Sequence, residues 1–260
     1  MNNTFRKIVR SLLVYFPFSQ GLKPMIQRGY HNLLRTPFEP DFRALELFPD
    51  SSDHLYLDVG GNNGLAVGAI HMYKPKARII SFEPNRMLAE KMSRVFRRNS
   101  KISVNPFGLG ERETHLPLFV PAYKGRHFDG LASIYRSHAE ASMNSGEFLF
   151  FDKDSVRIHE YPCEIRTLDS LNLSPFFIKL DVQGAELSVL KGGEKTISRS
   201  RPVLLIESVS EEHMEFLGRF GYKVYSFDTE KGKFVRDARG RVNSFVMTDD
   251  KIDLVKEYVG

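Results

Sequence analysis

The sequence predicts an α/β protein: a doubly wound, mostly parallel sheet of about seven strands with an N-terminal helical cap. Two observations predict it. Short apolar runs alternate with helix-like segments along most of the chain, which is typical of a parallel sheet covered on both faces. The last two apolar runs are joined by a segment without a clear helix, which indicates a hairpin with one antiparallel strand at the edge.

Each predicted element follows from a local pattern. The strands are expected at residues 54–59, 77–82, 101–107, 176–180, 202–206, 222–227 and 243–248. Helices are expected from Gly64 to Tyr73, over residues 85–98, after Gly184, and over residues 211–219. The helix at 85–98 carries Leu88, Met92, Val95 and Phe96 on one side, with Asn85 as its N-cap.

Two segments fall outside this alternation. Residues 1–50 form the expected cap segment, in which residues 4–16 place apolar side chains at helical spacing opposite Arg6, Lys7 and Arg10. Such a helix could contact a membrane surface or a partner, but a cap packed on its own domain is favoured. The remaining residues, 51–260, form one domain, in which 116–164 is a long irregular insertion.

Composition narrows the functional classes. The net charge is +5 among 260 residues, yet no zinc pattern or repeat of basic and aromatic residues indicates nucleic-acid binding. The longest apolar stretch, residues 11–18, is too short to span a bilayer, and no cleavage site predicts export. The single Cys163 excludes an internal disulfide and suits a reducing, cytoplasmic compartment. It lies in a probable strand, so an inert thiol is favoured over a nucleophile.

The first strand end reads LDVGGNNG. Asp58 closes the strand, and a glycine-rich turn follows that allows a ligand to approach the backbone: Gly60, Gly61 and Gly64. Asn62 stands where the dinucleotide fingerprint has its second glycine. A carboxylate at Asp58 suits a cationic ligand group, such as an ammonium or a sulfonium. A tight strand–helix turn would explain the glycines equally well.

The second and third strand ends add a nucleoside signature. Glu83, in SFEPN, lies nineteen residues after Gly64, the spacing at which an acidic residue meets a ribose diol. Pro84 ends that strand. The third strand end, VNPFGLG, offers Asn105, Phe107 and Gly108 to an adenine ring, and a plain turn is the competing interpretation.

The stretch FFIKLDVQGAELSVLKGG ends the fourth strand. Asp181 stands at its carboxyl end, beside the first strand, and Gly184 and Ala185 are small enough for a close approach. Glu186 falls in the first turn of the next helix, where the helix dipole favours a carboxylate whatever the function.

In this order and spacing, LDVGGNNG, SFEPN, TLDSL and FIKLDVQGAELSVLKGG resemble the FkbM family of S-adenosylmethionine-dependent methyltransferases over roughly residues 55–207. Gly61 and Gln183 depart from the family pattern, which commonly has Ala and Glu there. The resemblance implies a class I methyltransferase sheet with S-adenosyl-L-methionine as cofactor. Its cofactor-binding residues would be Asp58, Gly60, Gly61, Asn62, Gly64, Glu83, Pro84, Asn105, Phe107 and Gly108.

The resemblance also implies a chemistry and an acceptor side. Family members methylate hydroxyl groups of sugars and polyketide-type products, so a group must accept the hydroxyl proton. Asp181 is the first candidate and His138 the second, although Asp181 could instead hold the substrate or the cofactor, and His138 could simply be exposed. Ser133, which resembles a serine common in the family, Gln183 and Glu186 are expected on the substrate side, as is the insertion 116–164.

The favoured function is therefore O-methylation of a glycan or a glycosylated natural product, with a polyketide-type hydroxyl or a nitrogen acceptor as alternatives. No metal is predicted, because Asp181, Glu186 and Glu207 lack tight ligand spacing. An NAD-dependent oxidoreductase is disfavoured by Asn62 and Asp58. A non-catalytic partner protein is disfavoured by the intact motifs.

Overall fold

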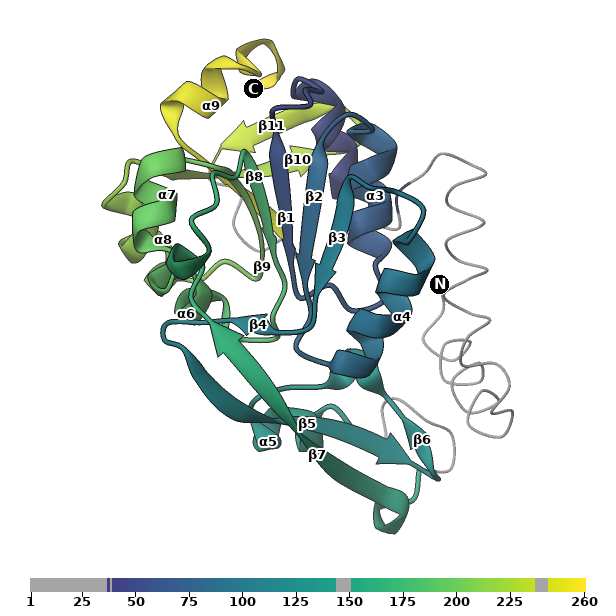
Figure 1. The fold of residues 1–260 in the computed structure, drawn as a ribbon. Coiled ribbons are helices and arrows are strands. Elements are labelled where there is room, and N and C mark those ends of the chain that lie inside the picture. Colours follow the sequence, from purple (N-terminus) through teal and green to yellow (C-terminus); the bar gives the residue numbers. More distant parts are fainter. Residues whose placement is uncertain (1–36, 38, 144–150, 237–242) are drawn as a thin grey trace.

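The computed structural model describes residues 37, 39–143, 151–236 and 243–260, and its centre is an eight-stranded sheet in the order β11-β10-β12-β9-β8-β1-β2-β3 (Figure 1). Its strands are β1 Leu55–Val59, β2 Arg78–Phe82, β3 Ile102–Asn105, β8 Phe177–Leu180, β9 Val203–Glu207, β10 Lys223–Asp228, β11 Lys233–Arg236 and β12 Asn243–Met247. The five strands from β3 to β9 run parallel, whereas β12 is antiparallel to both β9 and β10. The predicted doubly wound, mostly parallel α/β fold is confirmed.

Two details of the sheet differ from the prediction. The last two predicted strands, β10 and β12, pair antiparallel as expected, but β12 lies between β9 and β10 instead of at the edge. An eighth strand, β11, pairs with β10 at the edge. Its sequence, KFVR, is strongly charged, and only Phe234 is fully buried, so it carries no clear strand signal.

Helices cover both faces of the sheet. In Figure 1, α3 (Leu65–Tyr73) and α4 (Arg86–Phe96) lie on one side, and α6 (Glu186–Lys191), α7 (Glu194–Ser200) and α8 (Glu211–Gly218) lie on the other. Successive strand residues point to opposite faces. Tyr56 therefore packs in the cluster that contains α3, whereas Leu57 packs with α6 to α8. The chain ends with α9 (Asp249–Asp253) and a 3-10 helix, η6 (Lys256–Tyr258).

The predicted cap is described only in part. A 3-10 helix, η2 (Pro40–Leu47), buries Phe42 and Leu45 completely against the core that contains α3. The basic helix expected at residues 4–16 lies outside the described residues, as does any contact it makes with a membrane or a partner. In the described ranges, no helix is long and apolar enough to cross a membrane.

A second sheet, in the order β4-β7-β5-β6, lies beyond the carboxyl ends of β1 to β3 (Figure 1). Its strands are β4 Gly108–Leu109, β5 Thr114–Tyr123, β6 Arg126–His127 and β7 Val156–Arg166. Shorter helices accompany it: η3 Asp129–Leu131, α5 Arg136–Ala141 and η4 Lys153–Ser155. A further 3-10 helix, η5 Asp169–Leu171, follows β7 and packs against α7.

Much of the insertion expected to be irregular is thus a long antiparallel pair, with β5 paired to β7 from Thr114↔Ile165 to Tyr123↔Val156. The sequence did not predict this pair of strands, because it contains prolines and proline is rare inside paired strands. Pro117 and Pro162 lie directly opposite each other in this ladder.

Candidate active site

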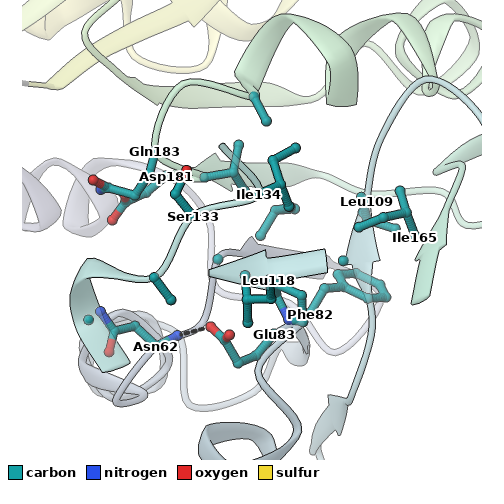
Figure 2. Close-up of a pocket in the computed structure, with 18 of the residues that line it drawn as sticks. Asn62, Phe82, Glu83, Leu109, Leu118, Ser133, Ile134, Ile165, Asp181 and Gln183 are labelled. Atoms are coloured by element: carbon teal, nitrogen blue, oxygen red, sulfur yellow. Dashed lines mark hydrogen bonds between the residues drawn. The ribbon is translucent and has the colours of Figure 1, made fainter. Parts of the chain in front are cut away.

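A cavity lies between the strand ends of the main sheet and the second sheet (Figure 2). Figure 2 shows Asp181 and Gln183 on one side of it, and the hydrogen-bonded pair of Asn62 and Glu83 on another. Several residues predicted from the sequence line this cavity: Gly60, Asn62, Glu83, Pro84, Gly108, Ser133, Asp181 and Gln183.

The turn after β1 is fixed by a close approach. Gly60 has φ +89°, and a Cβ on it would lie 1.8 Å from the Asp181 carbonyl oxygen, so only glycine fits where the β1 and β8 loops touch. The amides of Gly60 and Gly61 both donate to the Phe82 carbonyl, at 3.0 and 3.1 Å. These engaged amides do not offer the bare N–H groups that a pyrophosphate uses, which disfavours a dinucleotide.

Glu83 is held by backbone amides. Its Oε2 accepts from the Asn62 amide at 2.7 Å and its Oε1 from the Asn85 amide at 2.8 Å. Asn85 in turn caps α4 through its side chain. Burial raises the pKa of Glu83 to about 7, although both amide bonds favour the charged form. Each carboxylate oxygen keeps a further lone pair for a hydroxyl donor in the cavity.

A buried lysine joins the β1 and β8 strand ends. Lys179 Nζ donates to Asp181 Oδ2 at 2.9 Å and lies 3.8 Å from Asp58 Oδ1. Burial disfavours its charge, but the two carboxylates outweigh burial and raise the pKa of Lys179. Asp58 is 0% exposed, does not line the cavity, and accepts from Ser81 Oγ at 2.8 Å. The cation beside Asp58 is therefore that of Lys179.

Asp181 has a second set of partners. Burial raises its pKa, but the charge of Lys179 and the hydrogen bonds it accepts outweigh burial, and its pKa is lowered. Gln183, at φ +55°, donates from Nε2 to Asp181 Oδ1 at 3.0 Å and to Glu207 Oε2 at 3.4 Å. Burial, together with Asp181, raises the pKa of Glu207 to about 7. Near neutral pH, Asp181 is ionised while Glu207 exchanges a proton.

The residues expected on the substrate side take different positions. Ser133 is buried on the cavity wall, where its Oγ accepts from the Tyr135 amide at 3.1 Å. His138 is exposed on α5 and does not line the cavity, but it lies against the β8 loop: a Cβ on Gly184 would be 3.3 Å from His138 Cε1.

Glu186 turns back onto its own loop, where its Oε1 accepts from the Val182 amide at 2.9 Å and the Gly184 amide at 3.3 Å. It thereby shapes the loop that carries Gln183. Among the described residues, no group of three or more His, Cys, Asp or Glu side chains could hold a metal ion.

Besides Asp58, four more residues predicted to bind the cofactor do not line the cavity. A Cβ on Gly61 would be 2.3 Å from Ser81 Oγ, and one on Gly64, whose φ is +72°, would be 2.9 Å from Met92 Sδ, so local packing and backbone conformation explain both glycines without a ligand. Phe107 is buried between Phe82 and Arg166, with Arg166 4.4 Å from its ring centre. The Asn105 carbonyl accepts from the Glu83 amide at 3.0 Å. Their cofactor contacts stay predictions.

Sequence reasoning gave no role to two residues of this region, Lys179 and Asp129, and it considered Glu207 only as a metal ligand. Lys179 had a signal, because a lysine inside an apolar strand requires a buried partner. Glu207 ends the strand next to Asp181, and strand pairing alone predicts that contact. Asp129 lines the cavity from the second sheet and had no local signal.

Comparison with known proteins shows the family to which the chain belongs. The family model described as the Methyltransferase FkbM domain matches residues 58–235, well over half of the chain. The chain belongs to this family. Its domain is therefore an S-adenosylmethionine-dependent methyltransferase domain, and the resemblance read from the strand-end motifs is confirmed.

The individual proteins that this chain resembles are distant from it. The chain is 29% identical to "Methyltransferase 1" of Beauveria bassiana, over 56% of this chain and 59% of that protein. It is 30% identical to "AMB antimetabolite synthetase AmbE" of Pseudomonas aeruginosa, over 59% of this chain and 8% of that protein. A crystal structure of an FkbM methyltransferase from Methylobacillus flagellatus covers 77% of this chain, and the match covers 45% of that chain, with 23% identity and a TM-score of 0.48. The chain thus spans less than two thirds of the length of these relatives.

The residues that line the cavity fit S-adenosylmethionine. Glu83 keeps lone pairs of the kind that ribose hydroxyls need, and Gly60 lines the cavity without a side chain. The Asn62 Oδ1 atom is buried without a hydrogen-bond partner among the described residues, so it can accept from a ligand amine or hydroxyl. The ionised Asp181 suits the neighbourhood of a sulfonium.

Proposed function

We propose that this protein is an S-adenosylmethionine-dependent O-methyltransferase whose acceptor is a hydroxyl of a sugar, a glycan or a glycosylated natural product. One observation carries the proposal: Asp181, on the cavity wall, has a lowered pKa and is fixed by Lys179 and Gln183. An ionised, oriented carboxylate is the group that an attacking hydroxyl needs, because its proton must leave as the new bond forms.

The chemistry follows from these side chains. The cofactor supplies an activated methyl group, so catalysis consists mainly of positioning. When bound, S-adenosylmethionine would supply its methyl group to the acceptor oxygen, and Asp181 would take up the hydroxyl proton. Lys179 keeps Asp181 charged until then, and Gln183 orients its Oδ1.

Three neighbouring groups support a polyhydroxylated acceptor. Ser133, Asp181 and Gln183 line the cavity and supply a hydroxyl, a carboxylate and an amide. Such groups bind substrates with several hydroxyls, because each hydroxyl both donates and accepts a hydrogen bond. His138 lies against the same loop and is a second candidate for the proton acceptor.

A second candidate acceptor is a polyketide-type hydroxyl or an amine of a non-glycosylated natural product. Its support is the similarity to a relative named an antimetabolite synthetase, although only 8% of that protein is matched.

The test begins with binding. Isothermal titration of the purified protein with S-adenosylhomocysteine should give saturable binding, and an Asp181→Asn variant should retain it. Methyl transfer from labelled S-adenosylmethionine would then be measured on a panel of glycans, glycosylated metabolites, their aglycones and amines. The expected result is labelled glycan or glycoside with the wild type and with a Glu160→Gln control, an exposed site on β7, and none with Asp181→Asn.

Absence of cofactor binding in the wild type would contradict the whole proposal. Transfer to aglycones or amines alone would favour the second candidate. Full transfer by Asp181→Asn would remove Asp181 from the reaction and direct attention to His138.

A further inference from the structure

Residues 128–134, which we call the strap, connect β6 to α5 and close the cavity from the side of the second sheet. The strap is anchored to β5: the Phe119 amide donates to the Ser133 carbonyl at 2.8 Å, and the Ser133 amide donates back to Phe119 at 3.0 Å. The Phe128 amide donates to the Pro121 carbonyl at 2.8 Å. The strap therefore belongs to the second sheet, yet it lines a cavity made by the first.

One strap side chain reaches toward the β2 strand end. Asp129 Oδ1 accepts from Asn85 Nδ2 at 3.4 Å, and its Oδ2 lies 3.8 Å from Lys91 Nζ on α4. Asn85 also donates its backbone amide to Glu83 Oε1 at 2.8 Å. The same asparagine thus bridges two carboxylates, Glu83 and Asp129, and both line the cavity.

The proximity of the Glu83 and Asp129 carboxylates is unfavourable in the protein without a ligand. Glu83 is buried, and the nearby charge of Asp129 contributes to its raised pKa. The Asp129 side chain is only 19% exposed, and it makes one long hydrogen bond and one loose ion pair. Two carboxylates that line one cavity are stabilised by a ligand that carries several hydrogen-bond donors.

The strap also contacts the glycine-rich turn. A Cβ on Gly130 would lie 3.1 Å from Asn62 Nδ2, so the strap and the turn are in close contact. Asn62 Oδ1, beside that contact, is buried without a partner in the described part of the chain. Acceptor oxygens therefore surround this end of the cavity on three elements: Asn62 after β1, Glu83 after β2, and Asp129 in the strap.

We propose that Asp129 binds the nucleoside half of the cofactor together with Glu83, so that the second sheet supplies a wall of the cofactor site. The ribose hydroxyls and the adenine amino group are the donors that this set of acceptors recognises. The inference rests on the proposed methyl-transfer function. It also revises the expectation that residues 116–164 lie only on the substrate side, because an Asp129 contact makes cofactor binding depend on the second sheet.

The experiment measures affinity for S-adenosylhomocysteine and for adenosine in the full chain, with the wild type, Asp129→Asn, Asp129→Ala and a matched control, Asp154→Asn. Asp154 is an exposed carboxylate of the same insertion and does not line the cavity. Replacing a charged acceptor should weaken S-adenosylhomocysteine binding about 10-fold or more in both Asp129 variants and leave the control unchanged. Adenosine, which lacks the amino acid half, should lose affinity by the same factor.

Thermal unfolding of the ligand-free proteins separates binding from folding. If Asp129 acted only as a tie between the strap and α4, its variants would melt at lower temperature while S-adenosylhomocysteine affinity stayed at the wild-type value, and the inference would be overturned. An affinity loss for S-adenosylhomocysteine but not for adenosine would also overturn it, because the contact would then be with the amino acid half. If the wild type itself bound neither ligand, the proposed function would fail first.

Discussion

Glu83 and Asp181 line the same cavity, yet they are held in different ways. The Glu83 oxygens accept from the backbone amides of Asn62 and Asn85, whereas the Asp181 oxygens accept from the side chains of Lys179 and Gln183. The pKa of Glu83 is raised to about 7 by burial, and that of Asp181 is lowered by the charge of Lys179.

Under the proposed function, the difference separates a residue that binds the cofactor from one that accepts a proton. Backbone amides are fixed by the fold, so Glu83 keeps its position whatever its charge, which suits a group that holds a ligand. A side-chain network responds to protonation, because Lys179, Glu207 and Asp181 influence one another's charge. This suits a group that exchanges a proton.

The largest expected effect is at Gly60, where the β1 and β8 loops meet. In Gly60→Ala the new Cβ would overlap the Asp181 carbonyl, and the positive φ would be strained as well. We expect a loss of more than about 4 kcal/mol of unfolding free energy, and no binding of S-adenosylhomocysteine. The control is Gly68→Ala in α3, whose Cβ meets nothing within 4 Å among the described residues and should stabilise by about 0.5–1 kcal/mol. Wild-type stability in Gly60→Ala would show that the two loops are not held in contact.

Lys179 tests the side-chain network. Lys179→Met leaves Asp58 buried without a countercharge, which should cost about 3–5 kcal/mol in urea unfolding. The double variant Asp58→Asn with Lys179→Met removes that uncompensated charge and should recover much of the loss. A double variant no more stable than Lys179→Met alone would mean that the pairing with Asp58 is not what Lys179 contributes.

Glu83 tests the backbone-held side. Glu83→Gln should weaken S-adenosylhomocysteine binding by about 1.5–3 kcal/mol, because hydrogen bonds to a charged acceptor are lost. Ligand hydroxyls favour the ionised carboxylate, so binding lowers the pKa of Glu83 and releases protons. Wild-type affinity should therefore rise as the pH passes upward through about 7 and then level off, while the variant shows a flat profile. Calorimetry at pH 6, 7 and 8 measures this, and equal slopes for both proteins would contradict it.

Glu207 should give the smallest effect. Its folded-state pKa, about 7, is above the unfolded value near 4.5, so between these values the folded protein binds more protons and stability falls as the pH rises. Glu207→Gln removes this dependence. The difference in unfolding free energy between the variant and the wild type should therefore be about 1 kcal/mol more in favour of the variant at pH 8 than at pH 5. The effect is small because Glu207 is only half-buried and solvent screens its charge. Parallel pH–stability curves would exclude the proton exchange assigned to Glu207.

The features that the sequence predicted are those that local patterns encode. The parallel strands, the Gly60 turn and the carboxylate of Glu83 are encoded within a few residues of each other, so local patterns revealed them. The α/β fold and the family followed from these motifs.

The remainder depends on contacts between distant segments. Asp129 meets Asn85 across 44 positions of the sequence, and Glu207 meets Gln183 across 24. Nothing near Asp129 marks it as part of the cavity, whereas the pairing of β8 with β9 places Glu207 beside Asp181. The strands of the insertion were not predicted, because Pro117 and Pro162 interrupt the alternation of apolar and polar residues. In the structure these two prolines lie opposite each other, and the pairing of β5 with β7 continues on both sides of them.

Cys163 is the chain's single cysteine, and its side chain is buried in β7. Burial raises the pKa of its thiol to about 11, so maleimide reagents should leave it unlabelled in the folded protein. Fluorescent dyes could therefore be attached to cysteines introduced at exposed positions without first removing the native one. One dye on α5 and another on α4 would report directly whether the distance between the two sheets shortens when S-adenosylhomocysteine is added.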